Sequence, residues 1–107
     1  MASIAETCQK HALTESQFTA LRAKAVAAKE TAYCPYSKFR VGAAVLGADD
    51  SITTGANVEN ASYPVGTCAE RVAFGKAVTE GGVRAFKAVA VATDLLPMSF
   101  GPEKLQR

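Results

Sequence analysis

The short stretch Gly66–Arg71 carries a cysteine and a glutamate whose spacing could support chemistry, Cys68 and Glu70. Thr67 precedes Glu70 by three residues, a capping-box pattern that predicts a helix beginning here. Unpaired backbone N–H groups at a helix start favour negative charge, so Cys68 is a candidate metal ligand or nucleophile. Glu70 would then be close enough to reach whatever Cys68 holds. The alternative is a capped helix that contains an ordinary buried cysteine.

The composition limits the class of protein to which this chain can belong. With 107 residues the chain has room for one small domain, and its 49% hydrophobic and 21% charged residues are typical of a globular protein. The net charge of +2 does not argue for nucleic acid or a membrane as partner. The sequence contains neither a membrane-spanning apolar run nor a signal-peptide pattern. Three widely spaced cysteines do not form a disulfide framework, so we expect reduced thiols and a cytoplasmic location.

Hydrophobic periodicity and helix signals predict the elements before this stretch. Residues 1–12 are expected to form an N-terminal arm, and residues 13–107 the folded domain. Cys8 and His11 on the arm have metal-like spacing, which on a chain terminus is usually accidental. A capping box at Thr14–Gln17 begins a helix over about 14–33, which should end where Pro35 disfavours helical backbone.

The remaining pattern predicts strands and a second helix. Two strands form a hairpin over about 39–56 around the turn-forming residues Gly47–Asp50. The helix at about 67–80 ends at Gly81-Gly82, and a further strand covers about 86–93. Because the first and last strands are apolar on both faces, they need cover on both sides. We therefore predict an α/β fold with a three-layer α/β/α sheet.

Several stretches resemble one enzyme family. Cys-Ala-Glu at a helix start matches half of the zinc nucleobase deaminase signature. Tyr-Cys-Pro-Tyr-Ser-Lys-Phe-Arg-Val-Gly-Ala-Ala at 33–44, Asn-Val-Glu-Asn-Ala-Ser-Tyr-Pro at 57–64 and Ser-Phe-Gly-Pro-Glu at 99–103 are similar to segments of the small homotetrameric cytidine deaminases. The resemblance covers roughly residues 13–107. It implies the deaminase fold and a hydrolase of the free-nucleoside kind.

The resemblance also implies a reaction and a set of site residues. Zinc-dependent hydrolysis would convert cytidine or 2′-deoxycytidine to the uridine product in pyrimidine salvage, with a free pyrimidine nucleoside as partner and a homotetramer as assembly. Cys68 would be a zinc ligand and Glu70 the catalytic proton shuttle. The other implied contacts are Phe39 beside the pyrimidine, Asn57 and Glu59 on the ribose, Ala69 on the base, Ala61 and Tyr63 bordering the substrate site of a neighbouring subunit, and Phe100 contacting that neighbour. Asn57 and Glu59 could instead be ordinary loop residues, Phe39 and Phe100 core residues, and Tyr63 has no role fixed by the residues alone.

The chain departs from the family after Asp94, where it is internally shortened. Asp94 runs directly into Leu95–Phe100, and the Pro-Cys-x-x-Cys segment that the family places here is absent. Cys68 then supplies one of the three protein ligands of a catalytic zinc, unless Cys34 or the Cys8–His11 pair is recruited. We expect weak or no zinc binding, and a last strand left unpaired along one side. Three alternatives remain open: a cytidine deaminase, a noncatalytic subunit that docks onto complete relatives, and a truncated product without a stable fold.

Overall fold

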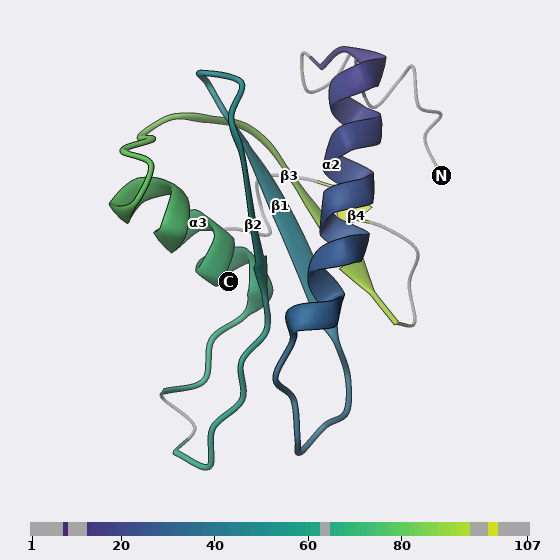
Figure 1. Ribbon diagram of the computed structural model, residues 1–107, viewed down its shortest axis with the longest axis vertical. Helices are drawn as coiled ribbons and strands as arrows, with labels where there is room; N and C mark the ends of the chain where they lie inside the picture. Colours follow the sequence, from purple (N-terminus) through teal and green to yellow (C-terminus); the bar gives the residue numbers. More distant parts are fainter. Residues whose placement is uncertain (1–7, 9–12, 63–64, 95–98, 101–107) are drawn as a thin grey trace.

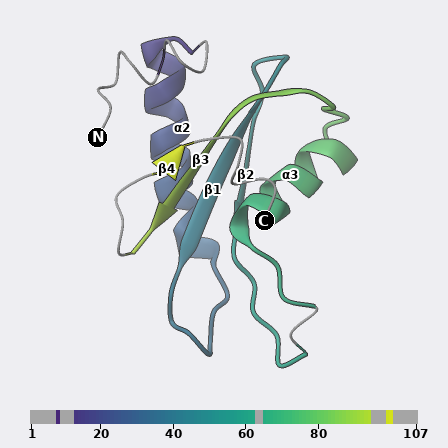
Figure 2. The same cartoon turned by 180° about the vertical axis from the view of Figure 1, so that it is seen from behind.

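The computed structural model describes residue 8 and residues 13–62, 65–94 and 99–100, with the side chains of 99–100 excepted. A sheet lies between two helices that cover its opposite faces (Figures 1 and 2). The elements are α2 (Glu15–Ala28), η1 (Lys29–Thr31), β1 (Val41–Gly47), β2 (Ile52–Ala56), α3 (Ala69–Thr79), β3 (Phe86–Thr93) and β4 (Ser99–Phe100). The predicted three-layer α/β/α architecture is confirmed.

The sheet contains four strands in the order β2-β1-β3-β4, and each neighbouring pair is antiparallel. The β1–β2 hairpin pairs Gly42 with Ala56 and Leu46 with Ile52. Its turn is tight because Asp50 adopts a left-handed conformation with φ of 70°. Strand β1 lies between β2 and β3. It begins at Val41 rather than at Phe39, because the backbone around Arg40 bonds to side chains instead of to a neighbouring strand.

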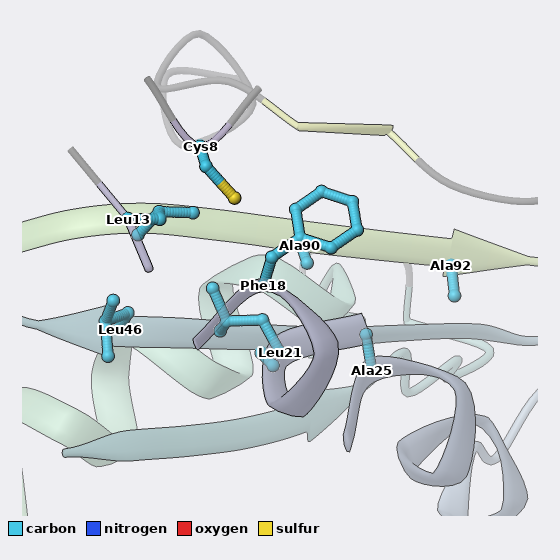
Figure 3. Close-up of a cluster of buried hydrophobic side chains, with 9 residues drawn as sticks. Cys8, Leu13, Phe18, Leu21, Ala25, Leu46, Ala90 and Ala92 are labelled. Atoms are coloured by element: carbon cyan, nitrogen blue, oxygen red, sulfur yellow. The ribbon is translucent and has the colours of Figure 1, made fainter. Parts of the chain in front are cut away.

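The face of the sheet under α2 holds one apolar cluster. Its buried members (Figure 3) are Cys8, Leu13, Phe18, Leu21, Ala25, Ala44, Leu46, Ala90 and Ala92. Leu21 and Leu46 have no exposed surface, so they anchor α2 on the sheet. Cys8, which the sequence places on the N-terminal arm, is 6% exposed and packs into this cluster.

The opposite face holds a second cluster, in which small side chains of α3 pack against β1 and β3. Its buried members are Ala43, Val45, Ala69, Ala73, Ala77, Val83, Val89 and Val91. The alanines at 69, 73 and 77 recur at a spacing of four residues, which places them on one side of the helix. Alternating residues of β1 and β3 therefore serve the two clusters, as expected for strands covered on both faces.

The two helix starts differ from each other. Thr14 is the N-cap of α2, where its hydroxyl accepts from the Gln17 N–H at 3.1 Å and the Gln17 side chain accepts from the Thr14 N–H at 3.0 Å. The capping box predicted at Thr14 is confirmed. The one predicted at Thr67 is wrong, because α3 has Cys68 as its N-cap and no side-chain capping bond. The Thr67 backbone N–H and carbonyl are both engaged with Val58, which keeps Thr67 extended and delays the helix.

Helix α2 is also shorter than predicted. The α-helical part ends at Ala28, and η1 follows it. Ala32 has an extended ψ of 142°, and the Tyr33 N–H donates to the Asn57 carbonyl at 3.0 Å. The helix therefore ends early because the chain must extend to pair with the segment after β2, ahead of the effect expected from Pro35.

The short strand β4 changes the expectation for β3. Ala90 pairs with Phe100 and Val91 with Ser99, so the prediction that β3 is unpaired along one side is wrong at these two positions. Over the described parts of the chain, this pairing reaches no other residue of β3. In those same parts, no helix has the length and apolar character needed to cross a membrane.

The contrast between the two helix starts gives a first prediction. Thr14→Ala should lower the free energy of unfolding by about 1 kcal/mol, because it removes one half of the capping box. Thr67→Ala is the matched control and should change it by less than about 0.5 kcal/mol, because Thr67 caps nothing. Urea denaturation of both variants checks this. Equal losses would contradict the assignment of the caps.

Candidate functional site

A pocket opens at the end of the sheet where η1 leads into β1 and β2 leads into α3. Its volume is about 940 Å³, within the range that holds a small organic ligand. The lining residues are Tyr36, Ser37, Asn57, Val58, Glu59, Asn60, Ala61, Gly66, Thr67, Cys68 and Arg71. The loops that carry most of them extend away from the sheet at the bottom of Figure 1.

Backbone pairing holds the pocket loops together. Val58 bridges Tyr33 in parallel and Thr67 in antiparallel orientation. The Glu59 N–H donates to the Tyr33 carbonyl at 2.8 Å, and the Val58 N–H donates to the Thr67 carbonyl at 2.9 Å. These bonds fix the loop after β2 between the segment before β1 and the segment before α3. Asn57 and Glu59, from the loop after β2, and Cys68, from the start of α3, thereby come to line one pocket.

Asn57 fastens the first of these segments through its side chain. Its amide oxygen accepts from the Val41 N–H at 3.0 Å, and its amide nitrogen donates to the Phe39 carbonyl at 2.9 Å. An amide group has two N–H donors and two lone pairs on its oxygen. One N–H and one lone pair therefore remain for a ligand, while the other pair orients the side chain.

Glu59 organises the turn at Tyr36–Lys38. One carboxylate oxygen accepts from the backbone N–H groups of Tyr36 at 3.0 Å and Ser37 at 3.1 Å, and the other accepts from the Ser37 hydroxyl. The Ser37 hydroxyl and then its backbone N–H hold the pKa of the Glu59 carboxyl below its ordinary value of 4.5. Lys38 adopts a φ of 61° in this turn. Glu59 is therefore an anion at neutral pH and is already oriented before any ligand arrives.

These contacts predict how Glu59 titrates. Because its folded-state pKa is lowered, its contribution to the fold is present above the unfolded-state pKa and is lost as the pH falls through the lower folded-state value. Ser37→Ala removes the largest cause, so the titration midpoint of the Glu59 carboxyl should move up toward 4.5. Carboxyl-carbon NMR measures it. Ser51→Ala is the matched control, since it removes the equivalent bond to Asp49 and should leave Glu59 unchanged.

Cys68 and Glu70, at the start of α3, differ in whether they reach the pocket. Cys68 is exposed and lines the pocket, whereas Glu70 is only 4% exposed and is absent from the lining. Arg71 also lines the pocket, and no pattern in the sequence singled it out. Its position three residues after Cys68 could have indicated it, because that spacing puts both on one side of a helix.

The other predicted residues are placed as follows. Ala61 lines the pocket. Ala69, the first residue of α3, is fully buried. Phe39 is half-buried, and its backbone carbonyl accepts a hydrogen bond from the Asn57 side chain. Tyr63 lies outside the described residues, and for Phe100 only the backbone in β4 is described. The roles expected for these residues stay predictions.

The donor groups present do not fit a catalytic zinc ion. Such a site uses three protein ligands and a water molecule. No cysteine or histidine follows Cys68 in the 107 residues. In the described parts of the chain no three histidine, cysteine or acidic residues are grouped so that they could hold a metal. Cys8 lies in the apolar cluster under α2, and Cys34 is absent from the pocket lining.

Comparison with known proteins decides the family. Residues 14–97 match the family described as cytidine and deoxycytidylate deaminase zinc-binding region. The chain belongs to this family. The prediction of a cytidine deaminase relative is thereby confirmed, and the description supports zinc as the cofactor of the family.

Individual relatives agree with this assignment. The chain is 55% identical over 74 residues to a cytidine deaminase of Sporosarcina psychrophila, covering 69% of this chain and 54% of the relative. It is 54% identical over 71 residues to one from Halalkalibacterium halodurans, covering 66% and 53%. The crystal structure of a Mycobacterium tuberculosis cytidine deaminase aligns with a TM-score of 0.71 at 37% identity, over 81% of this chain and 70% of that one. This deaminase-family chain spans about half the length of the two curated relatives.

Proposed function

We propose that this deaminase-family chain supplies the nucleoside-binding part of a cytidine deaminase site. The reaction of the complete site would be the hydrolytic deamination of cytidine or 2′-deoxycytidine to uridine or 2′-deoxyuridine, in pyrimidine salvage. The pocket that unites Asn57, Glu59 and Cys68 carries this proposal. The relatives named cytidine deaminase support it.

The pocket residues suit a nucleoside. Carboxylate and amide groups can accept from and donate to vicinal sugar hydroxyls, and both Asn57 and Glu59 are held in fixed orientations by backbone partners. Arg71 gives the pocket a cation, and Cys68 puts a thiol at the start of α3. In this proposal Phe39 and Ala69 contact the base, Ala61 and Tyr63 border a neighbouring subunit's site, and Phe100 contacts that neighbour in a homotetramer in the cytoplasm.

A second function is favoured by the surface near the pocket. Tyr33, Tyr36 and Val65 are 61–64% exposed, and Val58 is 41% exposed. Large apolar side chains gathered at one end of a molecule are typical of a contact with another protein. The chain would then dock, as an inactive subunit, onto complete cytidine deaminases. Co-expression with a differently tagged complete relative distinguishes the outcomes: soluble co-purification with reduced activity supports docking, and purification of the relative alone at full activity rejects it.

Titration of the purified chain with cytidine, followed by calorimetry and amide NMR, tests the main proposal. We expect saturable binding with shifts at Asn57, Glu59 and Thr67, and weaker binding for Glu59→Gln. Asp49→Asn is the control, because Asp49 is a carboxylate held in a turn at the other end of β1. Absence of binding by the folded chain, or equal binding by Glu59→Gln, would reject the proposal.

A further inference from the structure

A group of charged side chains outside the pocket joins three segments of the chain. Both carboxylate oxygens of Asp94, which follows β3, accept from the Arg40 guanidinium, at 3.3 Å from Nε and 3.2 Å from Nη2. The Arg40 backbone N–H donates to the same carboxylate at 3.1 Å. Lys29 of η1 donates to it at 3.3 Å, and Glu30 of η1 accepts from Arg40 at 2.5 Å. The end of β3, the segment before β1 and the end of the α2–η1 unit are thus tied at one point.

Arg40 lies between the two residues that the Asn57 side chain holds. Asn57 bonds to the Phe39 carbonyl on one side and to the Val41 N–H on the other. The Arg40 backbone N–H, between them, is bonded to Asp94 instead. The segment 39–41 therefore has two fastenings, the Asn57 amide and the Asp94 carboxylate. If the second is released, the partners of Asn57 lose part of what fixes their position.

We propose that Asp94 is a positioning residue of the pocket, which holds segment 39–41 through Arg40 and thereby orients the Asn57 amide toward a nucleoside. The inference rests on the proposed nucleoside binding. Neither Asp94 nor Arg40 lines the pocket, so neither touches the ligand. A bidentate bond between guanidinium and carboxylate fixes direction as well as distance, which is what orientation at a distance requires.

The side chains of this ion pair are partly buried and carry opposite charges. The side chains of Asp94, Arg40 and Lys29 are 29%, 44% and 18% exposed, so they are partly shielded from solvent. The hydrogen bond from Arg40 is the largest cause that holds the pKa of the Asp94 carboxyl below its ordinary value. Asp94 is therefore charged at neutral pH. Because the cluster is only partly shielded, added salt should weaken it.

The test compares Asp94→Ala with Asp50→Asn in the full chain. Asp50 forms a similar ion pair with Lys87 at 2.7 Å, at the hairpin and away from the pocket, and asparagine tolerates its left-handed backbone. For Asp94→Ala we expect cytidine to bind about five-fold more weakly, the order of effect of losing a partly exposed ion pair. Hydrogen exchange of the Val41 amide and the Asn57 carboxamide should be about ten-fold faster. Asp50→Asn should change neither quantity.

A double-variant cycle shows whether Asp94 acts through Arg40. Arg40→Gln should weaken cytidine binding, and adding Asp94→Ala to it should have little further effect. Fully additive effects would overturn the inference. So would unchanged binding and exchange in Asp94→Ala, or a loss of binding no larger than that in Asp50→Asn at an equal loss of thermal stability.

Two further arms separate the possible failures. If the folded wild-type chain does not bind cytidine, the proposed function fails, and exchange at Val41 and Asn57 still decides the role of Asp94. If Asp94→Ala does not fold, Asp94→Asn and a sodium chloride titration of the wild type replace it. Faster exchange at these two residues in either case supports the inference, and unchanged exchange in both overturns it.

Discussion

Replacing Gly42 with alanine is expected to lower the free energy of unfolding by about 3 kcal/mol or more, because the added methyl group has no space. A Cβ atom at this position of β1 would lie 2.1 Å from the Ala25 carbonyl oxygen and 2.7 Å from the Lys29 nitrogen. Both atoms belong to the backbone of the α2–η1 unit, which cannot swing aside as a flexible side chain would. The helix would have to lift from the sheet, and the apolar cluster beneath it would open.

Gly75→Ala provides the matched control. A Cβ atom there meets nothing within 4 Å, and Gly75 lies inside α3, where alanine is the better helix former. The same substitution should therefore stabilise the protein by about 0.5–1 kcal/mol. Chemical denaturation of the two variants, with near-ultraviolet circular dichroism to detect loss of packing, makes the comparison. A Gly42→Ala protein as stable as the wild type would show that α2 does not rest on β1 as described.

These close contacts mark a limit of prediction from the sequence. Apolar periodicity and the Thr14 capping box correctly indicated α2, the hairpin and β3, because those signals are local. Gly55 reads as an ordinary strand residue, yet its Cβ position lies 2.5 Å from the Ala73 backbone nitrogen. That approach depends on how α3 crosses β2, which no run of neighbouring residues encodes.

At the candidate site, too, some residues were predicted from the sequence and others were not. Cys68 was identified from its place at a predicted helix start, and Asn57 and Glu59 by resemblance; all three line one pocket. Ser37 and Arg71 were not identified. The position of Ser37 depends on how Val58 bridges the pocket loops, and that of Arg71 on how α3 is turned about its own axis. The error at Thr67 has this origin too: its capping pattern is sound locally, but pairing with Val58 on both backbone groups outweighs it.

The second large effect concerns turnover. We expect the 107-residue chain to deaminate cytidine no faster than buffer, although its pocket is formed. Cys68 is one candidate zinc ligand where three are needed, and no cysteine or histidine follows it in the sequence. Ultraviolet monitoring of cytidine loss measures this, with the complete Sporosarcina psychrophila enzyme as the positive control. Elemental analysis after gel filtration should find well below one zinc ion per chain.

Inserting a second ligand segment distinguishes an incomplete metal site from a faulty pocket. Insertion after Asp94 of a Pro-Cys-x-x-Cys segment should add two thiolates, raise the zinc content to about one ion per chain and produce turnover. Glu70→Gln in the chain with the insertion should then abolish turnover, because it removes the expected proton shuttle. It should leave cytidine binding largely intact, since Glu70 is buried and absent from the pocket lining. Turnover by the chain without the insertion that disappears in Glu70→Gln would instead mean that Cys68 has found other ligands. Variants at Cys34 and Cys8 would then identify them.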